Sequence, residues 1–539
     1  MFVVRCLVVT IVLGLVGCGG SDPAAVDAGD GDPGDAAGAA DGGGDVCAGV
    51  VCHPDATCTT VGADPTCTCR DGFTGDGVTS CVADCAQLCD LQIEPGQGSV
   101  SLAALAPGDT ACVLGGADGA RGPLVLTDAA GADGAPIVIT NCGAGVRLAS
   151  ASESPALAVT GHHFRITGSG TETVGYGLEL AAPLAAQALS LGKVHHLEVD
   201  RVEVSASEFA GFMIKRDPGA TACQVDDRRF DPFVMQGVAL HHNYIHDVVG
   251  EGIYLGNSFY NGATFSYCSA NAGCDWSACD ADYPVRAQYP HPVRGVRIYA
   301  NRIAGTGYDA IQVGAADEDC EIYDNVVEDF GTANIGSQNH GIQVGAGSSC
   351  RVYRNRLARG PHGLHLSGVG GTWAYNNLIV DVPGVGLVPN PAVPCGLAGQ
   401  NPCDALIRPY APASATTNFK GGMYLFNNTV VSAGTAARSM RRSGNEHFPE
   451  EQAENNLFVI DRDDPIERPE GWTLVANVAA RDAAAAGLVD AAGGDYRLLA
   501  ASPATDAGED LAARGIVDDL DGVSRPQGAG FDCGAYESH

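Results

Sequence analysis

The sequence predicts an all-β chain, a long solenoid of stacked short strands preceded by a small disulfide-rich module. Three observations predict this: β-branched runs separated by Gly and Asn after residue 98, one local pattern that recurs along the chain, and six cysteines within residues 47–81. Charged residues are 17% of the 539 and apolar residues 45%, which excludes a mainly disordered or coiled-coil chain. The formal charge of −34 argues against nucleic acid as a partner, because an acidic surface repels polyanions.

The first 18 residues are typical of a signal peptide. Arg5 precedes an apolar run that is too short to span a bilayer, and the 21 cysteines favour an oxidising compartment. The run ends in Leu15-Val16-Gly17-Cys18, which resembles the lipobox of bacterial lipoproteins. This resemblance implies lipidation of Cys18 and membrane attachment by the lipid anchor alone. Because Gly19 follows, it also implies outer-membrane delivery, at the cell surface or on the periplasmic face. An ordinary secretory signal with an incidental cysteine is the alternative.

Residues 19–46 predict a flexible acidic linker. They are almost entirely Gly, Ala, Asp and Pro, with seven aspartates and no basic residue. Such a segment buries too little apolar surface to offset its conformational entropy, and its like charges repel.

A small disulfide-rich module follows. Its cysteines are Cys47, Cys52, Cys58, Cys67, Cys69 and Cys81. Spacing alone leaves all fifteen pairings open. The stretch Cys67-Thr68-Cys69, followed by Asp71-Gly72-Phe73-Thr74-Gly75-Asp76-Gly77, resembles an EGF-like domain over about residues 43–82. The resemblance implies pairings Cys47–Cys58, Cys52–Cys67 and Cys69–Cys81 and a module that contacts a surface protein. Thr60 stands where calcium-binding members carry Asn or Asp, which argues against calcium here.

The rest of the chain repeats one pattern of two alternating apolar positions, a linking residue and Asn. Copies include Ile298-Tyr299-Ala300-Asn301, Ile322-Tyr323-Asp324-Asn325 and Val352-Tyr353-Arg354-Asn355, and the shortest separations are 24, 30 and 22 residues. One coil of three strands, each of roughly 3 to 6 residues, with three turns fits that length. Repeated asparagines at one bend can hydrogen-bond the coils above and below. Insertions rich in Pro and Cys lengthen the coils at about 257–295 and 389–419.

A second column lies downstream in each unit. Its copies are Gly177-Leu178-Glu179-Leu180, Gly211-Phe212-Met213-Ile214, Gly252-Ile253-Tyr254-Leu255, Ala310-Ile311-Gln312-Val313, Gly341-Ile342-Gln343-Val344 and Gly363-Leu364-His365-Leu366. Because strand side chains alternate, the aliphatic residues face one side and the residues between them face the other. Stacked coils would then bury columns of aliphatic side chains.

These two columns closely resemble the right-handed parallel β-helix of pectate-lyase-like proteins, over about residues 100–480. The resemblance is specific for the fold and not for an activity. We therefore expect a right-handed parallel β-helix at residues 97–480. Residues 481–539 are expected to form a cap, because Ser502-Pro503-Ala504-Thr505-Asp506 and Asp532-Cys533-Gly534-Ala535-Tyr536 resemble the C-terminal segment of secreted bacterial β-helix proteins. A propeller is disfavoured, since its blades need roughly 40 to 50 residues.

The remaining cysteines fit a cross-linked solenoid. Cys320 and Cys350 hold the same position in consecutive coils, and a coil spacing of about 4.8 Å permits a disulfide between them. Cys395 and Cys403 are expected to close one insertion, and Cys268, Cys274 and Cys279, with Cys223, to tie down another. With Cys18 lipidated, the mature chain holds an odd number of cysteines, so at least one stays unpaired.

Polar side chains gather at the outward positions of the second column. Within the strands these are Glu179, Met213, Tyr254, Gln312, Gln343 and His365, and directly before the strands they are Tyr176, Ala210, Glu251, Asp309, His340 and His362. Lys215 and Ser367 lie two residues further on, beside glycines in the coils between. We expect a shallow groove that binds extracellular polysaccharide or glycoconjugate, with Tyr254, Gln312, Gln343 and Arg216 as substrate-binding residues.

The candidate catalytic residues are Lys215, Glu251, Asp309, His340, His362 and His365. In polysaccharide lyases of this fold, a basic side chain removes the proton next to a uronate carboxylate while a cation or Ca2+ stabilises the developing charge. Lys215 would be that base, with the histidines as substitutes. A hydrolase instead requires two carboxyl groups, which Glu251 and Asp309 supply. The groove is not basic and has no aspartate cluster, so no cofactor is certain, and Ca2+ is the one that a lyase would use.

Several alternatives stay open. The polar residues can be hydrated solenoid side chains or can bind a glycan without chemistry. A metal site of His362, His365 and Asp309 has weak ligand spacing, and Asp247, Asp329 and Asp381 fit turn residues better than calcium ligands. The preferred hypothesis is a lipid-anchored cell-surface protein that recognises, and in its enzymatic version cleaves, extracellular polysaccharide. The alternative is a noncatalytic adhesion or surface-structural protein that contacts partners through the EGF-like module.

Overall fold

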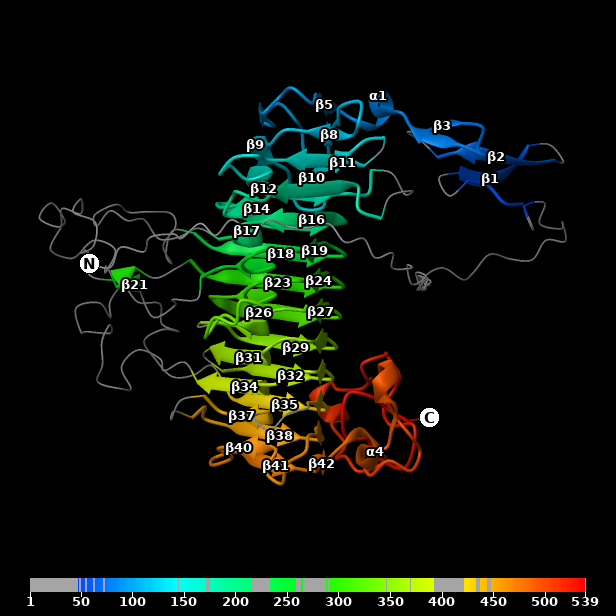
Figure 1. Ribbon diagram of the computed structural model, residues 1–539. Helices are drawn as coiled ribbons and strands as arrows, with labels where there is room; N and C mark the ends of the chain where they lie inside the picture. The colour runs from blue at the N-terminus through cyan, green and yellow to red at the C-terminus, as the bar shows by residue number, and fades with distance from the viewer. Residues whose placement is uncertain are drawn as a thin grey trace, which may run out of the picture.

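The computed structural model describes residues 47–538 except 48–49, 54–55, 62–63, 71–72, 144, 171–174, 216–232, 258–262, 265–286, 289–290, 346, 369, 392–420, 433–436 and 444–446. Figure 1 shows a column of stacked coils, with a small module at its N-terminal end and a looped segment beside its C-terminal end. Among these residues no helix is long and apolar enough to cross a membrane.

Three parallel ladders of strands form the column, and successive coils add one strand to each. The long strand β12 belongs to both ladder A and ladder B, because its first residues pair with β14 and its last with β15. Ladder A consists of β6 (Ser99–Ser101), β9 (Leu124–Ala130), β12 (Leu157–Thr167), β14 (Gln187–Leu191), β17 (Ala210–Ile214), β20 (Ile253–Leu255), β25 (Ile311–Val313), β28 (His340–Val344), β31 (His362–Gly368), β34 (Val385–Pro391), β37 (Arg438–Arg441) and β40 (Ile466–Glu467).

Ladder B consists of β5 (Leu91–Ile93), β7 (Thr110–Val113), β10 (Ile137–Asn141), β12, β15 (Val194–Asp200), β18 (Met235–His241), β23 (Val293–Tyr299), β26 (Ala316–Tyr323), β29 (Cys350–Tyr353), β32 (Thr372–Tyr375), β35 (Met423–Phe426), β38 (Glu451–Glu454) and β41 (Thr473–Val475). Ladder C consists of β8 (Ala120–Arg121), β11 (Val146–Ala149), β13 (Leu178–Ala182), β16 (Val202–Ser207), β19 (Tyr244–His246), β24 (Arg302–Ala304), β27 (Val326–Glu328), β30 (Arg356–Ala358), β33 (Leu378–Val380), β36 (Thr429–Val431), β39 (Leu457–Val459) and β42 (Val478–Ala480). The predicted all-β parallel β-helix is therefore confirmed.

Aliphatic side chains fill the inside of the coils. In ladder A, Ile253, Ile311, Ile342 and Leu364 stand at equivalent positions of adjacent strands, and each is fully buried. Burying one such side chain contributes about 1.5–3 kcal/mol. The period-two alternation read from the sequence therefore places one set of residues in the core and aims the residues between them away from it.

The recurrent asparagines form one buried column, the asparagine ladder, at the bend between ladders B and C. Its members are Asn243, Asn301, Asn325, Asn355, Asn377, Asn428, Asn456 and Asn477. Each Nδ2 donates to the Oδ1 of the next member; for Asn325 and Asn355 the distance is 2.9 Å. The linking residue before each Asn has a left-handed backbone, such as Asp324 with φ 55° and Arg354 with φ 51°. The bend therefore turns sharply while its buried polar groups stay hydrogen-bonded.

The N-terminal module contains two antiparallel pairs, β1 (Ala56–Val61) with β2 (Asp64–Cys69) and β3 (Phe73–Gly75) with β4 (Cys81–Ala83). It forms the three disulfides that the resemblance implied, Cys47–Cys58, Cys52–Cys67 and Cys69–Cys81. Two disulfides that the sequence did not predict, Cys85–Cys142 and Cys89–Cys112, join helix α1 (Cys85–Leu88) and the residue after it to the first coils. The segment that follows the module is thereby covalently held to the first coils.

Two further predictions concern cysteines of the solenoid and of the C-terminal segment. The predicted bond Cys320–Cys350 is present between adjacent strands β26 and β29. Cys533 is a free, buried cysteine among the described residues, and its thiol donates to the carbonyl of Ala476. Cys18, Cys395 and Cys403, and the predicted set Cys223, Cys268, Cys274 and Cys279, lie outside the described residues. The hairpin of β21 (Ala263–Thr264) and β22 (Ala287–Gln288) is the described part of one insertion.

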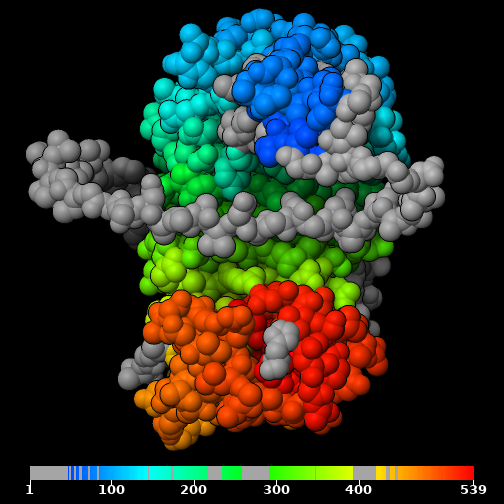
Figure 2. All heavy atoms as spheres, turned by 90° about the vertical axis from the view of Figure 1, so that its right-hand side faces the viewer, coloured from blue at the N-terminus to red at the C-terminus, as the bar shows by residue number. Residues whose placement is uncertain are grey.

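The C-terminal segment covers ladder C of the last coils (Figure 2). It contains helix α4 (Ala483–Ala486), the pair β43 (Leu488–Asp490) and β44 (Asp495–Leu498), and two 3-10 turns, η2 (Ala491–Gly493) and η3 (Ala512–Arg514). Leu520 and Tyr536 pack against Leu378 and Val380 of ladder C. A fully buried ion pair, Arg525 to Glu537 at 2.7 Å, holds the segment together. Apolar outer side chains of ladder C in these last coils are thus removed from water by the chain itself.

Candidate functional site

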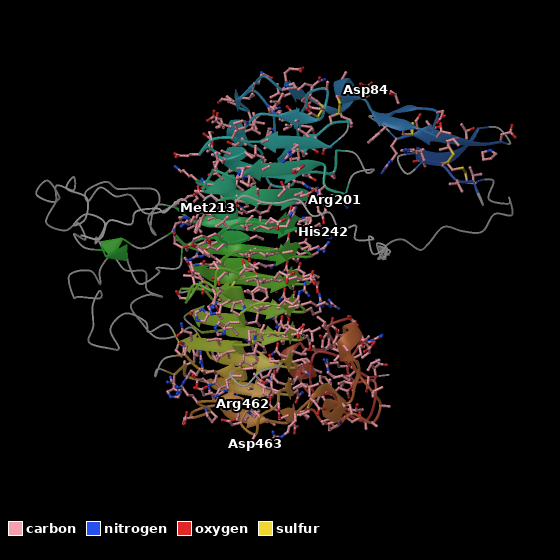
Figure 3. The ribbon with its side chains drawn as sticks, in the orientation of Figure 1. Asp84, Arg201, Met213, His242, Arg462 and Asp463 are labelled. Atoms are coloured by element: carbon pink, nitrogen blue, oxygen red, sulfur yellow. A yellow bond between two sulfur atoms is a disulfide. The ribbon has the colours of Figure 1, made fainter. Side chains whose placement is uncertain are left out.

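The second column of the sequence becomes a row of side chains across ladder A. We call Lys215, Glu251, Tyr254, Asp309, Gln312, His340, Gln343, His362 and His365 the polar row. Tyr254, Gln312, Gln343 and His365 occupy equivalent positions of β20, β25, β28 and β31. His340 pairs in register with His362. Met213 begins the same column, and Figure 3 places it on the opposite side of the solenoid from Arg201 and His242 of the B–C bend.

Two residues of the expected column lie elsewhere. Tyr176 and Glu179 belong to the start of ladder C, because β13 pairs with β11 and β16. Glu179 accepts hydrogen bonds from Arg147 and Ser205 there. The Gly-Leu-x-Leu pattern fits either ladder, since both alternate inward and outward residues. The alignment of this copy with the polar row was therefore wrong.

Most of the polar row is buried, which corrects the expected shallow groove, and Lys215, His362 and His365 are half-buried. Glu251 and Asp309 have no exposed surface, and Gln312 and His340 retain 2% and 6%. Part of the cover comes from the loop between β27 and β28, whose residue Gln338 donates to Glu251 Oε1 at 3.3 Å. Aromatic side chains border the same strands, with the Phe209 and Tyr308 rings 5.9 Å apart. Sequence periodicity gave the outward direction of these side chains but could not show that a distant loop covers them.

Two buried carboxyl groups are the most unusual feature of the row. Glu251 Oε2 and Asp309 Oδ2 have no hydrogen-bond partner among the described residues. Burial raises the pKa of Asp309 to about 8. Burial also raises the pKa of Glu251 to about 7, and the nearby Asp309 adds to this rise while Lys215 opposes it. At pH 7 Asp309 is therefore mostly protonated and Glu251 about half protonated, so the row holds a carboxyl group that can act as a general acid.

Asp309 contacts the imidazole ring of His340. Its Oδ1 accepts a hydrogen bond from the backbone N–H of His340 at 2.7 Å and lies 3.1 Å from His340 Nδ1. Burial lowers the pKa of His340 to about 4, so the ring is neutral at pH 7. When Nδ1 donates its proton to Asp309, Nε2 is left as a proton acceptor. An acid and a base are thus held next to each other in the row.

The other two histidines continue the row into the next coils. The His340 and His365 rings stack at 4.4 Å, and the His340 and His362 rings lie 5.5 Å apart. His365 lies between Gln343 Oε1, 2.9 Å from Nδ1, and Asn390 Nδ2, 3.1 Å from Nε2. Burial lowers the pKa of His362 to about 4 and that of His365 well below its usual range.

The predicted metal site does not form from the described residues. His362 Nδ1 accepts a hydrogen bond from the backbone N–H of Val385, and the donor atoms of Asp309, His362 and His365 do not converge on one point. Asp247, Asp329 and Asp381 are turn residues with left-handed backbones, φ 53°, 52° and 54°.

At the N-terminal end of the row, Lys215 and Tyr254 interact. The Lys215 ammonium lies 4.1 Å from the centre of the Tyr254 ring, a cation–π contact. Arg216 lies outside the described residues. The lysine of the candidate site thus lies over an aromatic ring.

Sequence reasoning missed two residues of this site. Asn390 pairs in register with Ser367 and donates to its Oγ at 2.8 Å. It belongs to the next coil, whose stretch Gly386-Leu387-Val388-Pro389-Asn390 follows the column pattern and could have revealed it. Gln338 comes from a loop that has no repeat, so no sequence signal pointed to it.

Comparison with known proteins identifies one domain. The EGF domain family matches residues 50–81, and no curated protein matches the chain. Among solved structures, pectate lyase Pel9A is 13% identical with a TM-score of 0.35, covering 81% of this chain and 90% of that one. An alginate lyase from Paenibacillus sp. str. FPU-7 is 14% identical with a TM-score of 0.32, covering 71% and 99%. At these values the likeness does not assign an activity to this chain.

Proposed function

We propose that the protein binds an extracellular polysaccharide along the polar row and cleaves it by acid–base chemistry. The observation that carries this proposal is the pair Asp309–His340 beside Glu251: two buried carboxyl groups with raised pKa values next to a neutral imidazole. Structural polar groups are normally satisfied, so buried carboxyl oxygens without partners need another explanation.

The chemistry of the row favours a neutral or weakly charged glycan. Amide, imidazole and carboxyl groups all exchange hydrogen bonds with sugar hydroxyls, and Tyr254 offers an aromatic ring beside Lys215. Two carboxyl groups face one lysine, so a polyuronate would meet repulsion whenever either carboxyl group is ionised. Glycoside hydrolysis uses one carboxyl group as acid and a second group as base. Glu251 and Asp309 are the carboxyl groups for these roles, and His340 is the alternative base.

Substrate access requires the cover to move. Residues 332–337 of the loop between β27 and β28 are exposed, and the contact from Gln338 to Glu251 is a single hydrogen bond of 3.3 Å. Displacing this loop would expose Glu251 without disturbing the ladders.

The test is a screen of the purified full chain on neutral and uronate polysaccharides, with and without Ca2+. Binding, new reducing ends and unsaturated products are measured separately. We expect reducing ends without unsaturation, and a roughly 10²–10⁴-fold loss of turnover in Asp309→Asn and Glu251→Gln. The matched control is Glu179→Gln, which changes a carboxyl group on ladder C. Binding of a glycan without turnover would support glycan recognition and contradict the proposed cleavage. Unchanged turnover in both variants would contradict the assignment of catalysis to Glu251 and Asp309.

A noncatalytic role in adhesion is the second candidate function, and the N-terminal module favours it. The module is cross-linked internally by three disulfides and projects from the column in Figure 1, and the segment that follows it, α1 and Cys89, is joined to the first coils by Cys85–Cys142 and Cys89–Cys112. We propose that it contacts a surface protein. Deleting residues 47–81 should abolish cell or protein binding while Asp309→Asn leaves it intact; the reverse result would assign adhesion to the solenoid.

We also propose attachment to the outer membrane through a lipid on Cys18, on the strength of Leu15-Val16-Gly17-Cys18. Labelled fatty acid should be incorporated into the wild-type chain and not into Cys18→Ser. Release of the unlabelled variant from the membrane fraction would support the anchor, whereas equal membrane retention of both would contradict it.

A further inference from the structure

Four histidines meet at one point of ladder B, away from the polar row. His162 and His163 lie in β12, and His195 and His196 lie at the equivalent position of β15 in the next coil. Adjacent residues of a strand normally point to opposite faces. We call two consecutive histidines a doublet. Here His163 and His196 have left-handed backbones, φ 49° and 52°, which brings both rings of each doublet to the same side. We call these four residues the histidine tetrad.

The rings of the tetrad lie in two stacked pairs. Nδ1 of His162 is 2.9 Å from Nδ1 of His163, and the same atoms of His195 and His196 are 2.8 Å apart. Between coils, the His162 and His195 rings stack at 5.0 Å and the His163 and His196 rings at 4.2 Å. One nitrogen from each of His163, His195 and His196 lies within 4.8 Å of the others. Three imidazoles, those of His163, His195 and His196, thus direct nitrogen atoms into one small volume, and the fourth ring, His162, contacts His163 at its edge.

A carboxylate orients the tetrad from outside. Asp133 Oδ1 lies 2.9 Å from His163 Nε2, and Asp133 itself is 91% exposed. An Nε2–H that donates to this carboxylate leaves Nδ1 of His163 as an acceptor facing the other rings. A carboxylate behind a histidine is the usual second layer of a metal site, because it fixes the tautomer and the ring orientation.

A third doublet shows that chain geometry alone gives a pair but not a tetrad. His241 and His242 have the same short contact between their Nδ1 atoms, 2.8 Å, and His242 has φ 54°. Their coil neighbours differ: the His241 ring stacks on Tyr299, and His241 Nε2 lies 3.1 Å from Glu198. Only in β12 and β15 do two doublets occupy consecutive coils in register.

The tetrad is accessible. A cavity of about 570 Å³ opens beside it, with His162, His195, Asp128 and Lys193 in its lining. An ion can therefore reach the imidazoles from solvent, and the cavity has room for water or a small anion as a further ligand.

We propose that the histidine tetrad binds one divalent transition-metal ion of the Zn2+, Cu2+ and Ni2+ class. Neutral imidazole nitrogen suits these ions, whereas Ca2+ and Mg2+ take oxygen ligands. Metal–nitrogen bonds of about 2.0–2.1 Å place tetrahedral ligands about 3.3 Å apart. Each doublet therefore opens by a few tenths of an ångström when the ion enters, and any longer nitrogen–nitrogen distance between the coils, up to 4.8 Å, shortens. The inference is independent of the polar row and of any glycan.

The test uses the full chain without a histidine tag, stripped with chelator and then dialysed against Zn2+ or Cu2+. Bound metal is measured by elemental analysis, affinity by calorimetry, and nitrogen ligation of Cu2+ by electron paramagnetic resonance. We expect one equivalent with a nitrogen signature, lost in His163→Gln/His196→Gln and retained in the matched doublet variant His241→Gln/His242→Gln. Asp133→Asn, which alters an exposed side chain and keeps the fold, should weaken affinity by about 10- to 100-fold.

The proposal is overturned if the wild-type chain retains no ion, if the tetrad variant retains it, or if Asp133→Asn leaves the affinity unchanged. Circular dichroism of the metal-free proteins checks that each variant is folded. Should the tetrad variant fail to fold, the Asp133→Asn affinity and the resonance spectrum of the wild-type chain decide the outcome.

Discussion

Two buried polar columns run through the same solenoid, and they differ in one respect. In the asparagine ladder each amide donates to the next member, so every rung supports its neighbours. In the polar row, Glu251 Oε2 and Asp309 Oδ2 are buried without a partner among the described residues. Both columns arise from the same coil repeat. Polar burial therefore has a structural explanation in the first column and lacks one in the second, which is why the second is the candidate site.

The largest effect on stability is expected from the satisfied column. Asn355→Ala removes the bonds from Nδ2 to Asn377 Oδ1 and to the carbonyl of Ile322, and leaves the backbone N–H of Asn325 without its acceptor. With about 1–3 kcal/mol for each unsatisfied buried group, the free energy of unfolding should fall by about 3 kcal/mol or more. Denaturant unfolding followed by circular dichroism measures this.

The control for Asn355→Ala is Asn477→Ala at the last rung of the ladder. Asn477 is only partly buried and donates to the carbonyl of Ala453. A smaller loss is expected there. Equal losses at both positions would mean that the ladder does not stabilise the chain through mutual hydrogen bonds.

Asp309→Asn should show a pH-dependent gain in stability. The pKa of Asp309 is raised from 3.8 to about 8, so between about pH 4 and pH 8 the folded state holds a proton that the unfolded state has lost. Wild-type stability from this group therefore falls as pH rises through that window, by up to about 1.4 kcal/mol per pH unit. The variant has no carboxyl group at this position and lacks this pH-dependent loss. Its free energy of unfolding relative to wild type should therefore rise with pH.

Unfolding midpoints of the two proteins at about pH 4.5 and about pH 7.5, near the two ends of this window, measure the difference. His362 and His365 titrate in both proteins and cancel in the comparison, whereas His340 contacts residue 309 and contributes to the difference. A difference that does not change with pH would mean that the pKa of Asp309 is the same in the folded and unfolded states. The buried carboxyl group would then not distinguish the polar row from the asparagine ladder.

A smaller effect is expected from Lys215→Met at the end of the row. It removes the cation over Tyr254 and the charge that lowers the pKa of Glu251. If the row binds glycan through the Tyr254 ring, affinity should fall about two- to fivefold, because the cation–π contact that holds this ring in place contributes about 0.5–1 kcal/mol. The pKa of Glu251 should rise, which moves the pH profile of turnover upward. An unchanged affinity and pH profile would place Lys215 outside the site.

Much of the fold follows from local patterns. The interval between Asn301, Asn325 and Asn355 gave the coil length, and Cys320 and Cys350 gave a contact between coils that the disulfide confirms. These features are readable because a solenoid repeats one set of neighbours, so a position in one coil predicts its contact in the next. Glu179 was assigned to the wrong ladder because ladders A and C share the same alternation of inward and outward residues.

The candidate site was less readable. The period-two pattern predicted the register of Tyr254, Gln312, Gln343 and His365. It could not predict the burial of Glu251, whose Oε1 accepts a hydrogen bond from Gln338 of a loop without a repeat. Nor did it single out the histidine tetrad, since its doublets depend on left-handed residues at His163 and His196.

The sequence by itself determined the repeat, the inward and outward alternation and the pairs of residues that stack between coils. Only the tertiary structure decided which outward residues are removed from water, and with them the protonation of Glu251, Asp309 and His340. The physical reason is that periodicity is a local property of the backbone. A pKa depends instead on every group packed around the side chain, including groups far away in the sequence.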